Sequence, residues 1–444
     1  MWRNWSGYVA CPLATVSTPA SSRDLVDILR KAKQTGSSVR AVGAGHSFSP
    51  LVHTDGSIVS LDRLQGIIDI DTARRVVHVH AGTRLHTLCP ALSAHGLAME
   101  NLGDINSQSI AGATSTGTHG TGIKLGNLAT QIASLTIMQT DGREIVATPE
   151  ENPDLFAGGR IGLGALGILT KIGLNVVPSF QLKMKRAKMQ LDECLAQAVS
   201  LTQRHRSFEM YWLPHTDTVL TKSWDVTDEP STPTNWRRYI TEDLLENAAF
   251  GFLCDLGKRL PSACPSISRF CSSLVGPGQH VDASHRMLST ARRVRFNEME
   301  WSVPAEHGEA ALREIRAFIS QKAFPLMFPL EYRWVRGDDI WLSPDFERDS
   351  VHISAHQYRG MPHERYFDGV QAICLNYGGR PHWGKMHTLR GQDFAKLYPH
   401  WEDFLALRQR MDPHGRFLTP YLRRLFGLDT VSSFENHSLR ENYA

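Results

Sequence analysis

The stretch that decides the fold is Leu102-Gly-Asp-Ile-Asn-Ser-Gln-Ser-Ile-Ala-Gly-Ala-Thr-Ser-Thr-Gly-Thr-His-Gly-Thr-Gly122. It holds five glycines and seven serines or threonines, and it lies between structured segments in the interior of the chain. Glycine lets a backbone approach a ligand closely. We therefore expect the stretch either to line a long ligand with backbone N–H groups and hydroxyls, or to be a flexible linker.

The segments around this stretch mix short strands with two helices. Ser21 and Asp24 resemble a capping box, and an apolar face follows, which predicts a helix ending at Gly36. Similar patterns predict a strand over Val39–Val42, a helix over Leu85–His95, a hairpin over Leu135–Val146 and a strand over Ile168–Val177. The order lacks a regular βαβ alternation, so the predicted fold class is α+β.

A second glycine-rich loop, Val42-Gly-Ala-Gly-His-Ser-Phe-Ser49, follows the predicted strand Val39–Val42 directly. Two glycines beside small residues let consecutive backbone N–H groups converge on an anion without a lysine. His46 lies inside this loop. From its composition alone, His46 is either a hydrogen-bonded loop histidine or a residue that contacts the ligand.

A third glycine pattern, Gly162-Leu-Gly-Ala-Leu-Gly167, matches the GxGxxG spacing. A dinucleotide-binding loop needs a strand before it, a helix after it and an acidic residue about 20 residues later. Residues 156–160 do not form a strand pattern, residues 168–177 do, and residues 182–188 contain no acid. We interpret the pattern as a loop in which the backbone packs closely against something flat, and not as an NAD site.

The texture of the sequence changes after Pro178, where long polar stretches appear. Helical patterns at 192–203, 305–319 and 363–376 and strand patterns at 208–213, 328–335 and 351–356 predict a second α+β domain. A last amphipathic helix is predicted over Phe394–Met411. The polar residues 428–444 are predicted to be a loose tail.

Two segments of the second half carry candidate chemistry. Glu331 and Arg333 point to the same face if their segment is a strand, either as a fixed pair in a cleft or as a surface pair. Gly378-Gly-Arg-Pro-His-Trp-Gly-Lys385 gathers two cations, a histidine and a tryptophan. That loop is expected to hold an anion or a developing oxyanion, or to be a solvated basic turn. His382 in this loop and His387 just after it have no carboxylate or cysteine at metal spacing, so we predict no metal site.

Composition excludes several classes of protein. The chain has 444 residues, with 48 Lys and Arg against 45 Asp and Glu. This nearly balanced charge gives no indication that the protein binds nucleic acid or an anionic membrane. Seven scattered cysteines without a CxxC pair favour a reducing compartment. The first residues lack a secretory pattern, and no run of 18 apolar residues is present. We expect a soluble, cytoplasmic protein without a membrane span.

Taken together, these segments resemble the aldonolactone oxidoreductases of the vanillyl-alcohol-oxidase superfamily of FAD enzymes. The resemblance covers almost all of residues 5–427. It is carried by the segments GAGHSFS (43–49), 101–122, GNLATQ (126–131), LGALG (163–167), EYRWVRGDDIWLSP (331–344), GRPHWGK (379–385) and DPHGRFLTPYL (412–422).

The resemblance implies a two-domain flavoprotein. Residues 1–178 would form the first part of an FAD-binding domain, residues 179–387 a cap that covers the substrate, and residues 388–427 a segment that returns to the FAD domain. His46 stands where the family attaches FAD covalently through the flavin 8α-methyl group. Other cofactor-binding positions would be Gly43, Ala44, Gly45, Ser47, Gly103, Ser115, Gly117, Thr118, His119, Gly120, Gly122 and Ile168.

The resemblance also implies an activity, the oxidation of a sugar-1,4-lactone such as L-gulono-1,4-lactone to an ascorbate-type product. Glu331, Arg333 and Lys385 would be catalytic. Asp104, Ser354, His356, Arg380 and His382 would bind substrate. Gly103 stands at the family's oxygen-gating position, where a small residue implies an oxidase that makes hydrogen peroxide. An alditol oxidase, a lactone dehydrogenase with another electron acceptor, and an FAD-binding protein without turnover remain alternatives.

Overall fold

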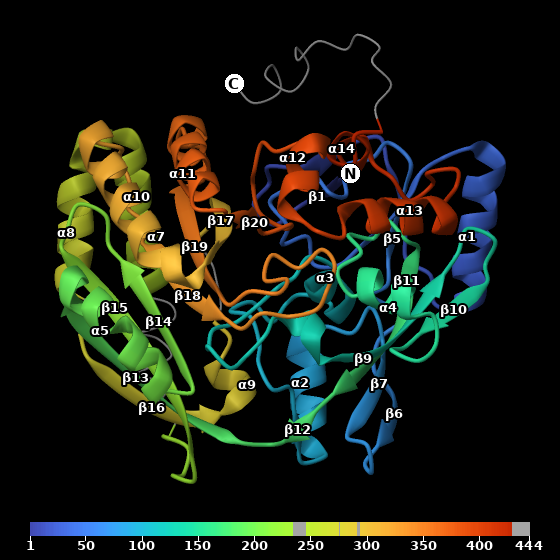
Figure 1. Cartoon of the computed structure of the whole chain (residues 1–444), viewed down its shortest axis with the longest axis horizontal. Helices are drawn as coiled ribbons and strands as arrows, with labels where there is room; N and C mark the ends of the chain where they lie inside the picture. The colour runs from blue at the N-terminus through green and yellow to red at the C-terminus, as the bar shows by residue number, and fades with distance from the viewer. Residues whose placement is uncertain (234–245, 275, 291–293, 429–444) are drawn as a thin grey trace.

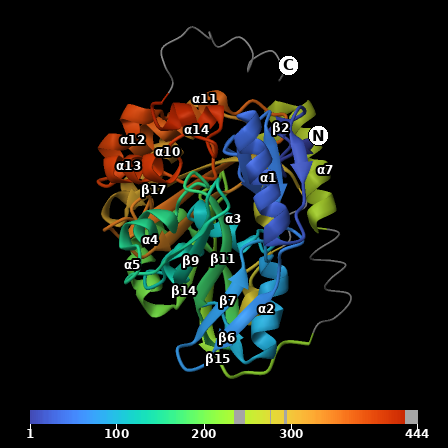
Figure 2. The ribbon, with the colours of Figure 1, turned by 90° about the vertical axis from the view of Figure 1, so that its right-hand side faces the viewer.

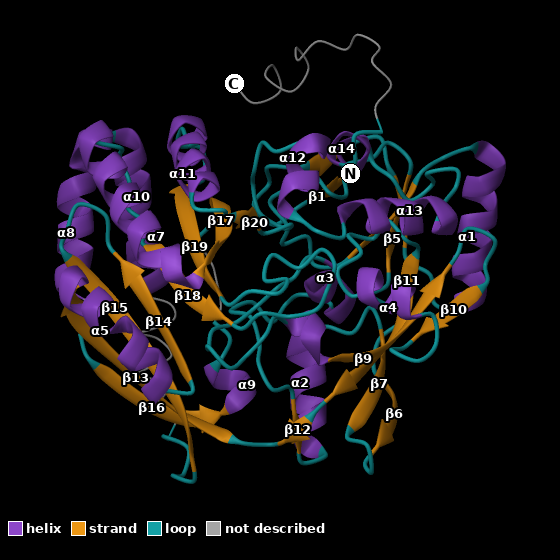
Figure 3. Ribbon diagram, viewed as in Figure 1, coloured by secondary structure: helices purple, strands orange, loops and turns teal. Residues whose placement is uncertain are grey.

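The computed structural model describes residues 1–233, 246–274, 276–290 and 294–428. The predicted tail 428–444 therefore lies, after its first residue, outside the described residues. Within the described ranges, no helix is both long and apolar enough to cross a membrane. Two lobes lie side by side, and Figures 1 and 3 show mixed helices and strands in each, in agreement with the predicted α+β class.

The first lobe is built on two larger sheets, one of three strands and one of five. The three-stranded sheet is parallel, with β5 (Ser57–Ser60) between β3 (Thr15–Ser17) and β4 (Val39–Val42). The five-stranded sheet is antiparallel in the order β10-β9-β11-β7-β6. Its strands are β10 (Glu144–Ala147), β9 (Ile132–Met138), β11 (Ile168–Asn175), β7 (Val76–His80) and β6 (Ile67–Asp71). Strands β9 and β10 confirm the predicted hairpin.

The first helix of this lobe begins and ends where the sequence signals it. Helix α1 (Ser22–Thr35) is capped by the side chain of Ser21 with Asp24 in a complete capping box, and Gly36 closes it with φ 73°. Helix α2 (Leu85–Ala94) buries its leucines in the same core as those of α1. The other helices are α3 (Ile110–Ser115), inside the deciding stretch, and α4 (Pro153–Gly159). Short pairs complete the lobe: β1 (Trp2–Arg3) with β2 (Ala10–Cys11), and β8 (Leu97–Ala98) with β12 (Val177–Pro178).

The second lobe is built on one antiparallel sheet of eight strands, in the order β16-β13-β15-β14-β18-β19-β17-β20. These are β16 (Gly278–Ala283), β13 (Gln181–Gln190), β15 (Thr218–Thr227), β14 (Ser207–Trp212), β18 (Leu330–Val335), β19 (Ser350–Tyr358), β17 (Phe296–Pro304) and β20 (Arg380–Pro381). Helices α5 (Leu191–Arg204), α10 (Gly308–Lys322) and α11 (Glu364–Asn376) pack on one face of the sheet in a single core cluster. Helices α7 (Glu246–Arg259) and α8 (Cys264–Leu274) belong to a separate cluster that includes Phe48 of the first lobe, and Figure 2 shows α7 on the other side of the molecule from α10. The short α9 (Ser284–Met287) lies near the first lobe in Figure 1.

The end of the chain returns to the first lobe. Helices α12 (Gly391–Leu397), α13 (Trp401–Met411) and α14 (Pro420–Leu425) lie together at the top of Figure 2, and Phe394, Trp401 and Phe404 belong to the core that α1 and α2 share. The prediction of one helix over Phe394–Met411 was wrong. Tyr398 is extended (φ −118°, ψ 113°) because the proline that follows it disfavours a helical backbone.

Loops join the lobes where the predicted motifs meet. The N–H of Gly122 donates to the carbonyl of Trp334 at 2.7 Å, which ties the deciding stretch to strand β18. The N–H of Phe48 donates to the carbonyl of Gly384 at 2.6 Å, which ties the loop after β4 to the GRPHWGK loop. Four motifs that are far apart in the sequence therefore surround one region between the lobes.

Candidate functional site

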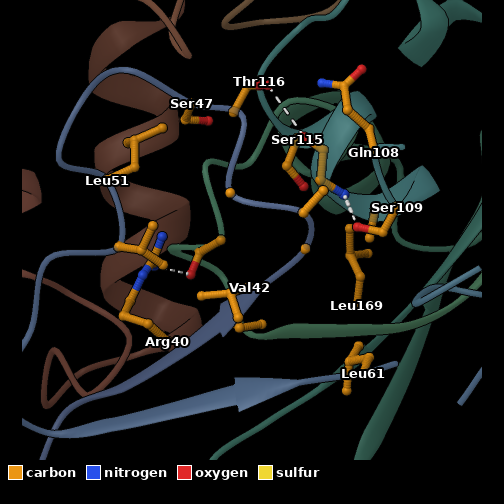
Figure 4. A pocket seen from close by; sticks show the side chains of 18 of the residues that line it. Arg40, Val42, Ser47, Leu51, Leu61, Gln108, Ser109, Ser115, Thr116 and Leu169 are labelled. Atoms are coloured by element: carbon orange, nitrogen blue, oxygen red, sulfur yellow. Dashed lines mark hydrogen bonds between the residues drawn. The ribbon is translucent and has the colours of Figure 1, made fainter. Parts of the chain in front are cut away.

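A long cavity follows the loop after β4. Its walls include the whole stretch from Arg40 to Ser47, the start of the deciding stretch's helix α3, and the GxGxxG loop. Figure 4 shows Val42, Ser115 and Leu169 from three different segments facing this space. Six glycines line it: Gly43, Gly45, Gly82, Gly112, Gly164 and Gly167. A Cβ on Gly43 would lie 2.4 Å from Ser109 Oγ, so a side chain there would displace the hydroxyl that caps α3.

A buried cation lies at one end of this cavity. The Arg40 guanidinium donates to the carbonyls of Leu163, Gly164 and Phe417, which joins β4 to the GxGxxG loop and to the returning C-terminal segment. Its Nε is buried without a partner. Burial lowers the pKa of Arg40 to about 10, although Asp412 opposes this shift. The end of the cavity is thus electropositive and suited to an anionic group.

A second cavity continues from the first. Four residues line both cavities: His46, Ser47, Gln108 and Thr116. Beyond them the wall changes character, because charged and aromatic side chains from the second lobe replace glycines. The two cavities together form an elongated site whose first part is glycine-rich and whose second part carries ionisable groups.

His46 stands at the junction of the two cavities. Its Nε2 lies 2.7 Å from Ser107 Oγ, and its ring stacks on Trp5 with a centroid separation of 5.4 Å. Burial lowers the pKa of His46 to about 4, with Lys385 and Arg84 acting in the same direction. The ring is therefore neutral at physiological pH, and a neutral imidazole nitrogen is a nucleophile.

Glu331 and Arg333 form a fixed pair in the second cavity, as the cleft interpretation predicted. Arg333 Nη2 lies 2.5 Å from Glu331 Oε1, and Arg333 Nε donates to Glu209 at 2.9 Å. Both lie on β18, and Glu209 lies opposite Arg333 on β14. Burial disfavours the Arg333 charge, but the two carboxylates outweigh burial and raise its pKa well above the usual value. Arg333 is thus a permanent cation in the wall of the second cavity.

Lys385 is held by two carboxylates that the sequence analysis missed. Its Nζ lies 2.5 Å from Glu298 Oε2 and 3.8 Å from Glu300 Oε2, and both acids come from β17. Burial lowers the pKa of Lys385, but these carboxylates outweigh burial and raise it. The only signal in the sequence was the alternation of acids with Met299 and Trp301, which is also typical of a strand with one face in solvent.

Behind Glu300 lies a row of buried ionisable groups. His119 Nε2 lies 2.5 Å from Glu300 Oε1, and His352 Nδ1 lies 3.0 Å from the same oxygen. His352 Nε2 lies 2.7 Å from Asp345 Oδ1. Three of these side chains, His119, Glu300 and His352, lie close enough together to ligate a metal ion, but they already bond to one another. A second group, Glu298, Glu331 and His356, could also ligate a metal ion. In this structure the carboxylate of Glu298 contacts Lys385, and that of Glu331 contacts Arg333.

The structure separates the predicted substrate-binding residues into two groups. Asp104, His356 and His382 line the second cavity. Arg380 lines neither cavity, because its guanidinium donates to the backbone carbonyls of Leu397, Pro344 and Phe346. Ser354 also lines neither cavity, and its hydroxyl donates to Glu300 at 2.9 Å.

The predicted cofactor residues divide in the same way. Gly43, Ala44, Gly45, His46, Ser47 and Ser115 line the first cavity, and Thr118 and His119 line the second. Gly103, Gly117, Gly120 and Gly122 line neither. A Cβ on Gly120 would lie 2.4 Å from the Leu102 carbonyl, so this glycine lets the loop pack on itself. Ile168 points into the core, and Leu169, which faces the other side of the strand, lines the first cavity.

The shape and chemistry of the first cavity fit an adenine dinucleotide. The glycine wall, the loop of backbone N–H groups and the buried Arg40 suit a pyrophosphate, and the junction suits a flavin next to His46. A family model described as FAD binding domain matches residues 13–148. A second, described as D-arabinono-1,4-lactone oxidase, matches residues 172–425, more than half of the chain. The chain belongs to the aldonolactone oxidoreductase family.

Individual relatives agree with this membership. The chain is 37% identical to L-gulono-1,4-lactone dehydrogenase of Mycobacterium tuberculosis, over 96% of this chain and 99% of that protein. It is 33% identical to L-gulonolactone oxidase of Mus musculus, over 96% and 98% of the two chains. The fold is similar to a crystal structure of cholesterol oxidase from B. sterolicum, with a TM-score of 0.81 over 96% of each chain at 17% identity. The aldonolactone oxidoreductase is therefore an FAD-binding oxidoreductase with an FAD-binding domain and a cap domain.

Proposed function

We propose that this aldonolactone oxidoreductase oxidises a sugar-1,4-lactone such as L-gulono-1,4-lactone at the carbinol carbon beside the lactone carbonyl. The 2-keto-lactone product would enolise to ascorbate or an analogue. Bound FAD supplies the hydride acceptor, N5 of the flavin, and oxygen is the proposed final electron acceptor, giving hydrogen peroxide. The observation that carries this proposal is the second cavity, where Glu331, Arg333 and Lys385 converge beyond His46.

The substrate hydroxyl must lose a proton as its carbon loses hydride. Glu331 is the carboxylate that we assign to orienting the hydroxyl and accepting this proton. Arg333, which lies 2.5 Å from Glu331, fixes that carboxylate and faces the same cavity. Its second carboxylate partner, Glu209, keeps the guanidinium from swinging toward the substrate when Glu331 changes its protonation state.

Lys385 supplies a positive charge that the reaction uses twice. An alkoxide-like oxygen develops on the substrate, and negative charge then appears on the reduced cofactor. The ammonium is fixed by Glu298 at 2.5 Å and lies over the ring of Phe48, 5.2 Å from the ring centroid. His382 accepts the N–H of Gly384 at Nδ1, so its Nε2 carries the proton and is a candidate donor to a substrate oxygen. Asp104 and His356 are proposed to contact the sugar hydroxyls.

His46 is proposed to form a covalent bond with the flavin. Its place at the junction and its neutral ring support this assignment. Residues 43–47 are proposed to hold the pyrophosphate and Ser115, Thr118 and His119 to lie along the flavin. We assign residues 1–178 and 388–427 to the FAD-binding domain and residues 179–387 to the cap, since the last helices share the core of the first lobe.

Oxygen is one of two candidate electron acceptors for the reduced flavin. The relative from Mycobacterium tuberculosis carries the name of a dehydrogenase and the relative from Mus musculus that of an oxidase. Gly103 supports the oxidase, because it packs behind Thr118, a residue of the second cavity, and leaves no side chain there. A lactone dehydrogenase that uses another acceptor is the second candidate.

The experiment is a peroxide assay on the purified protein in air, over a panel of sugar-1,4-lactones and matched alditols. The oxidase proposal expects peroxide equal to the lactone consumed, and faster turnover with a lactone than with any alditol. The same assay without oxygen but with an artificial dye acceptor tests the second candidate. Turnover with dye and none with oxygen would make the protein a dehydrogenase.

A further inference from the structure

Four buried ionisable side chains extend from the second cavity into the second lobe: His119, Glu300, His352 and Asp345. All are less than 6% exposed. Each neighbouring pair lies within hydrogen-bond distance, from 2.5 to 3.0 Å. Because burial of an unpaired charge is costly, the protons in this row must be arranged so that the charges compensate. We call these four residues the buried relay.

The protonation of His352 follows from its partners. Its Nδ1 faces Glu300 at 3.0 Å and its Nε2 faces Asp345 at 2.7 Å. An ionised carboxylate can accept hydrogen bonds but cannot donate them, so both ring nitrogens of His352 must carry a proton. Burial opposes this charge, but Asp345 and Glu300 outweigh burial and raise the pKa of His352 to about 9. His352 is a cation between two anions.

The hydrogen-bond partners of His119 also fix where its protons lie. Its Nδ1 lies 2.8 Å from the carbonyl of Gly120, which can only accept, so Nδ1 carries a proton. Its Nε2 lies 2.5 Å from Glu300 Oε1. One proton must lie between these two atoms, whichever of them it is assigned to. With it the buried relay is neutral, since two carboxylates face two protonated rings.

The neutrality of the buried relay matters to Lys385. Glu300 Oε2, which accepts the hydroxyl of Ser354 at 2.9 Å, lies 3.8 Å from Lys385 Nζ. Lys385 already has Glu298 as a partner at 2.5 Å. Two uncompensated carboxylates would make this end of the cavity negative and would oppose negative charge on substrate or flavin. The two histidines compensate Glu300 and Asp345, so the ammonium remains effective.

We propose that the buried relay is a positioning unit that fixes Lys385 through Glu300 while its two histidines cancel the carboxylate charge, so that the second cavity keeps a positive potential. This inference rests on the proposed FAD site. The charged and titratable groups that face the buried relay from neighbouring segments are Lys385, Glu298, His382, Asp338, Arg348, Arg380 and Tyr398. Arg348 and Arg380 act on Asp345 electrostatically, but their guanidinium groups donate to backbone carbonyls, and neither residue is changed by the variants below. Glu298 is paired with Lys385, and burial keeps His382 neutral and raises the pKa of Asp338 to about 7, so none of these three replaces the charge of His352.

The test changes the charge of the buried relay in both directions. His352→Asn removes one positive charge, Asp345→Asn removes one negative charge, and the double variant restores the balance. The readout is the affinity of the bound flavin for sulfite, which binds to oxidised flavin as an anion and is sensitive to local potential. It requires no turnover of a substrate. His205 and Asp225, a His–Asp pair at 2.7 Å that lines neither cavity, give matched controls as His205→Asn and Asp225→Asn.

At about pH 8, His352→Asn is expected to weaken sulfite binding by about fivefold or more, and Asp345→Asn to tighten it. The double variant should return to within about twofold of the unchanged protein, because a charge-balanced pair has little field at a distance. The control variants should not differ from the unchanged protein.

Several outcomes would overturn the proposal. A shift of both single variants in the same direction would indicate damage to packing and not a charge effect, as would a double variant that binds sulfite as weakly as His352→Asn. If His352→Asn does not fold, Asp345→Asn alone decides, because unchanged or weaker sulfite binding contradicts the charge account. An unchanged protein that holds no FAD would instead remove the proposed function.

Discussion

The ammonium of Lys385 lies 2.5 Å from the carboxylate of Glu298, a residue 87 positions earlier in the chain, and the two side chains meet at the wall of the second cavity. Burial alone would raise the pKa of Glu298, but Lys385 and His356 outweigh burial and lower it to about 2. Both partners are therefore charged at physiological pH. The pair therefore gives the wall of the second cavity a cation whose position is fixed.

Replacing Lys385 with Met should slow reduction of the flavin by lactone well over tenfold, since the developing negative charge loses its cation. The measurement is anaerobic stopped-flow reduction at saturating substrate. Because Met leaves Glu298 unpaired in a buried site, the double variant Lys385→Met with Glu298→Gln is the control for misfolding. An unchanged reduction rate in either variant would remove Lys385 from the reaction.

Replacing Gly103 with Ala should lower the rate of flavin reoxidation by oxygen about tenfold or more and leave reduction by lactone nearly unchanged. A Cβ at this position lies 2.7 Å from Thr118 Cγ2, so Thr118 must shift as well. The double variant Gly103→Ala with Thr118→Ser removes that methyl group and separates the two effects. Full recovery of reoxidation in the double variant would assign the effect to Thr118, and equal rates in all three proteins would refute an oxygen gate.

Replacing His46 with Ala should leave the flavin releasable by acid, whereas the unchanged protein should keep its yellow colour in the acid precipitate. Ser107→Ala is the matched control, because it removes the hydroxyl that lies 2.7 Å from His46 Nε2 and should slow formation of the bond without preventing it. Colour in the supernatant of the unchanged protein would show that His46 binds the flavin without a covalent bond.

The sequence predicted the parts of the site that lie within single segments. The loops at 43–49, 102–122 and 379–385 and the Glu331–Arg333 pair have patterns that local geometry can explain. It did not predict Glu209, Glu298 or Glu300, because their role arises from pairing of strands far apart in the chain. It also did not predict Asp345, a loop residue whose role depends on its contact with His352. Strand β17 alternates acids with apolar residues as a half-exposed strand would, yet Glu298 and Glu300 are both about 5% exposed or less.

Arg380 illustrates the opposite error. From the sequence alone, a cation-rich loop suggests an anion site. In the structure the Arg380 guanidinium donates to three backbone carbonyls and lies over the ring of Tyr398, 5.3 Å from its centroid. A sequence pattern does not show which backbone carbonyls will accept a hydrogen bond from a given side chain. The break between α12 and α13, in contrast, was predictable from Pro399 and the restriction it places on Tyr398.

Stability should depend on pH through His352. Its pKa is 6.5 in the unfolded chain and about 9 in the folded protein, so its contribution is fully present below pH 6.5 and is lost as pH rises through about 9. The free energy of unfolding should therefore fall over that range, by at most on the order of 3 kcal/mol. Urea unfolding midpoints across the range measure it. The double variant His352→Asn with Asp345→Asn should lack this component, and identical pH profiles for the two proteins would contradict the assignment.

The most direct measurement of the proposed function is anaerobic mixing of the purified holoenzyme with L-gulono-1,4-lactone, followed by its visible spectrum. The proposal predicts that the absorbance of oxidised flavin bleaches within one turnover, faster than with an alditol at equal concentration, and returns with an equivalent of hydrogen peroxide when oxygen is admitted. A flavin that an alditol bleaches and no lactone does would contradict the lactone as substrate.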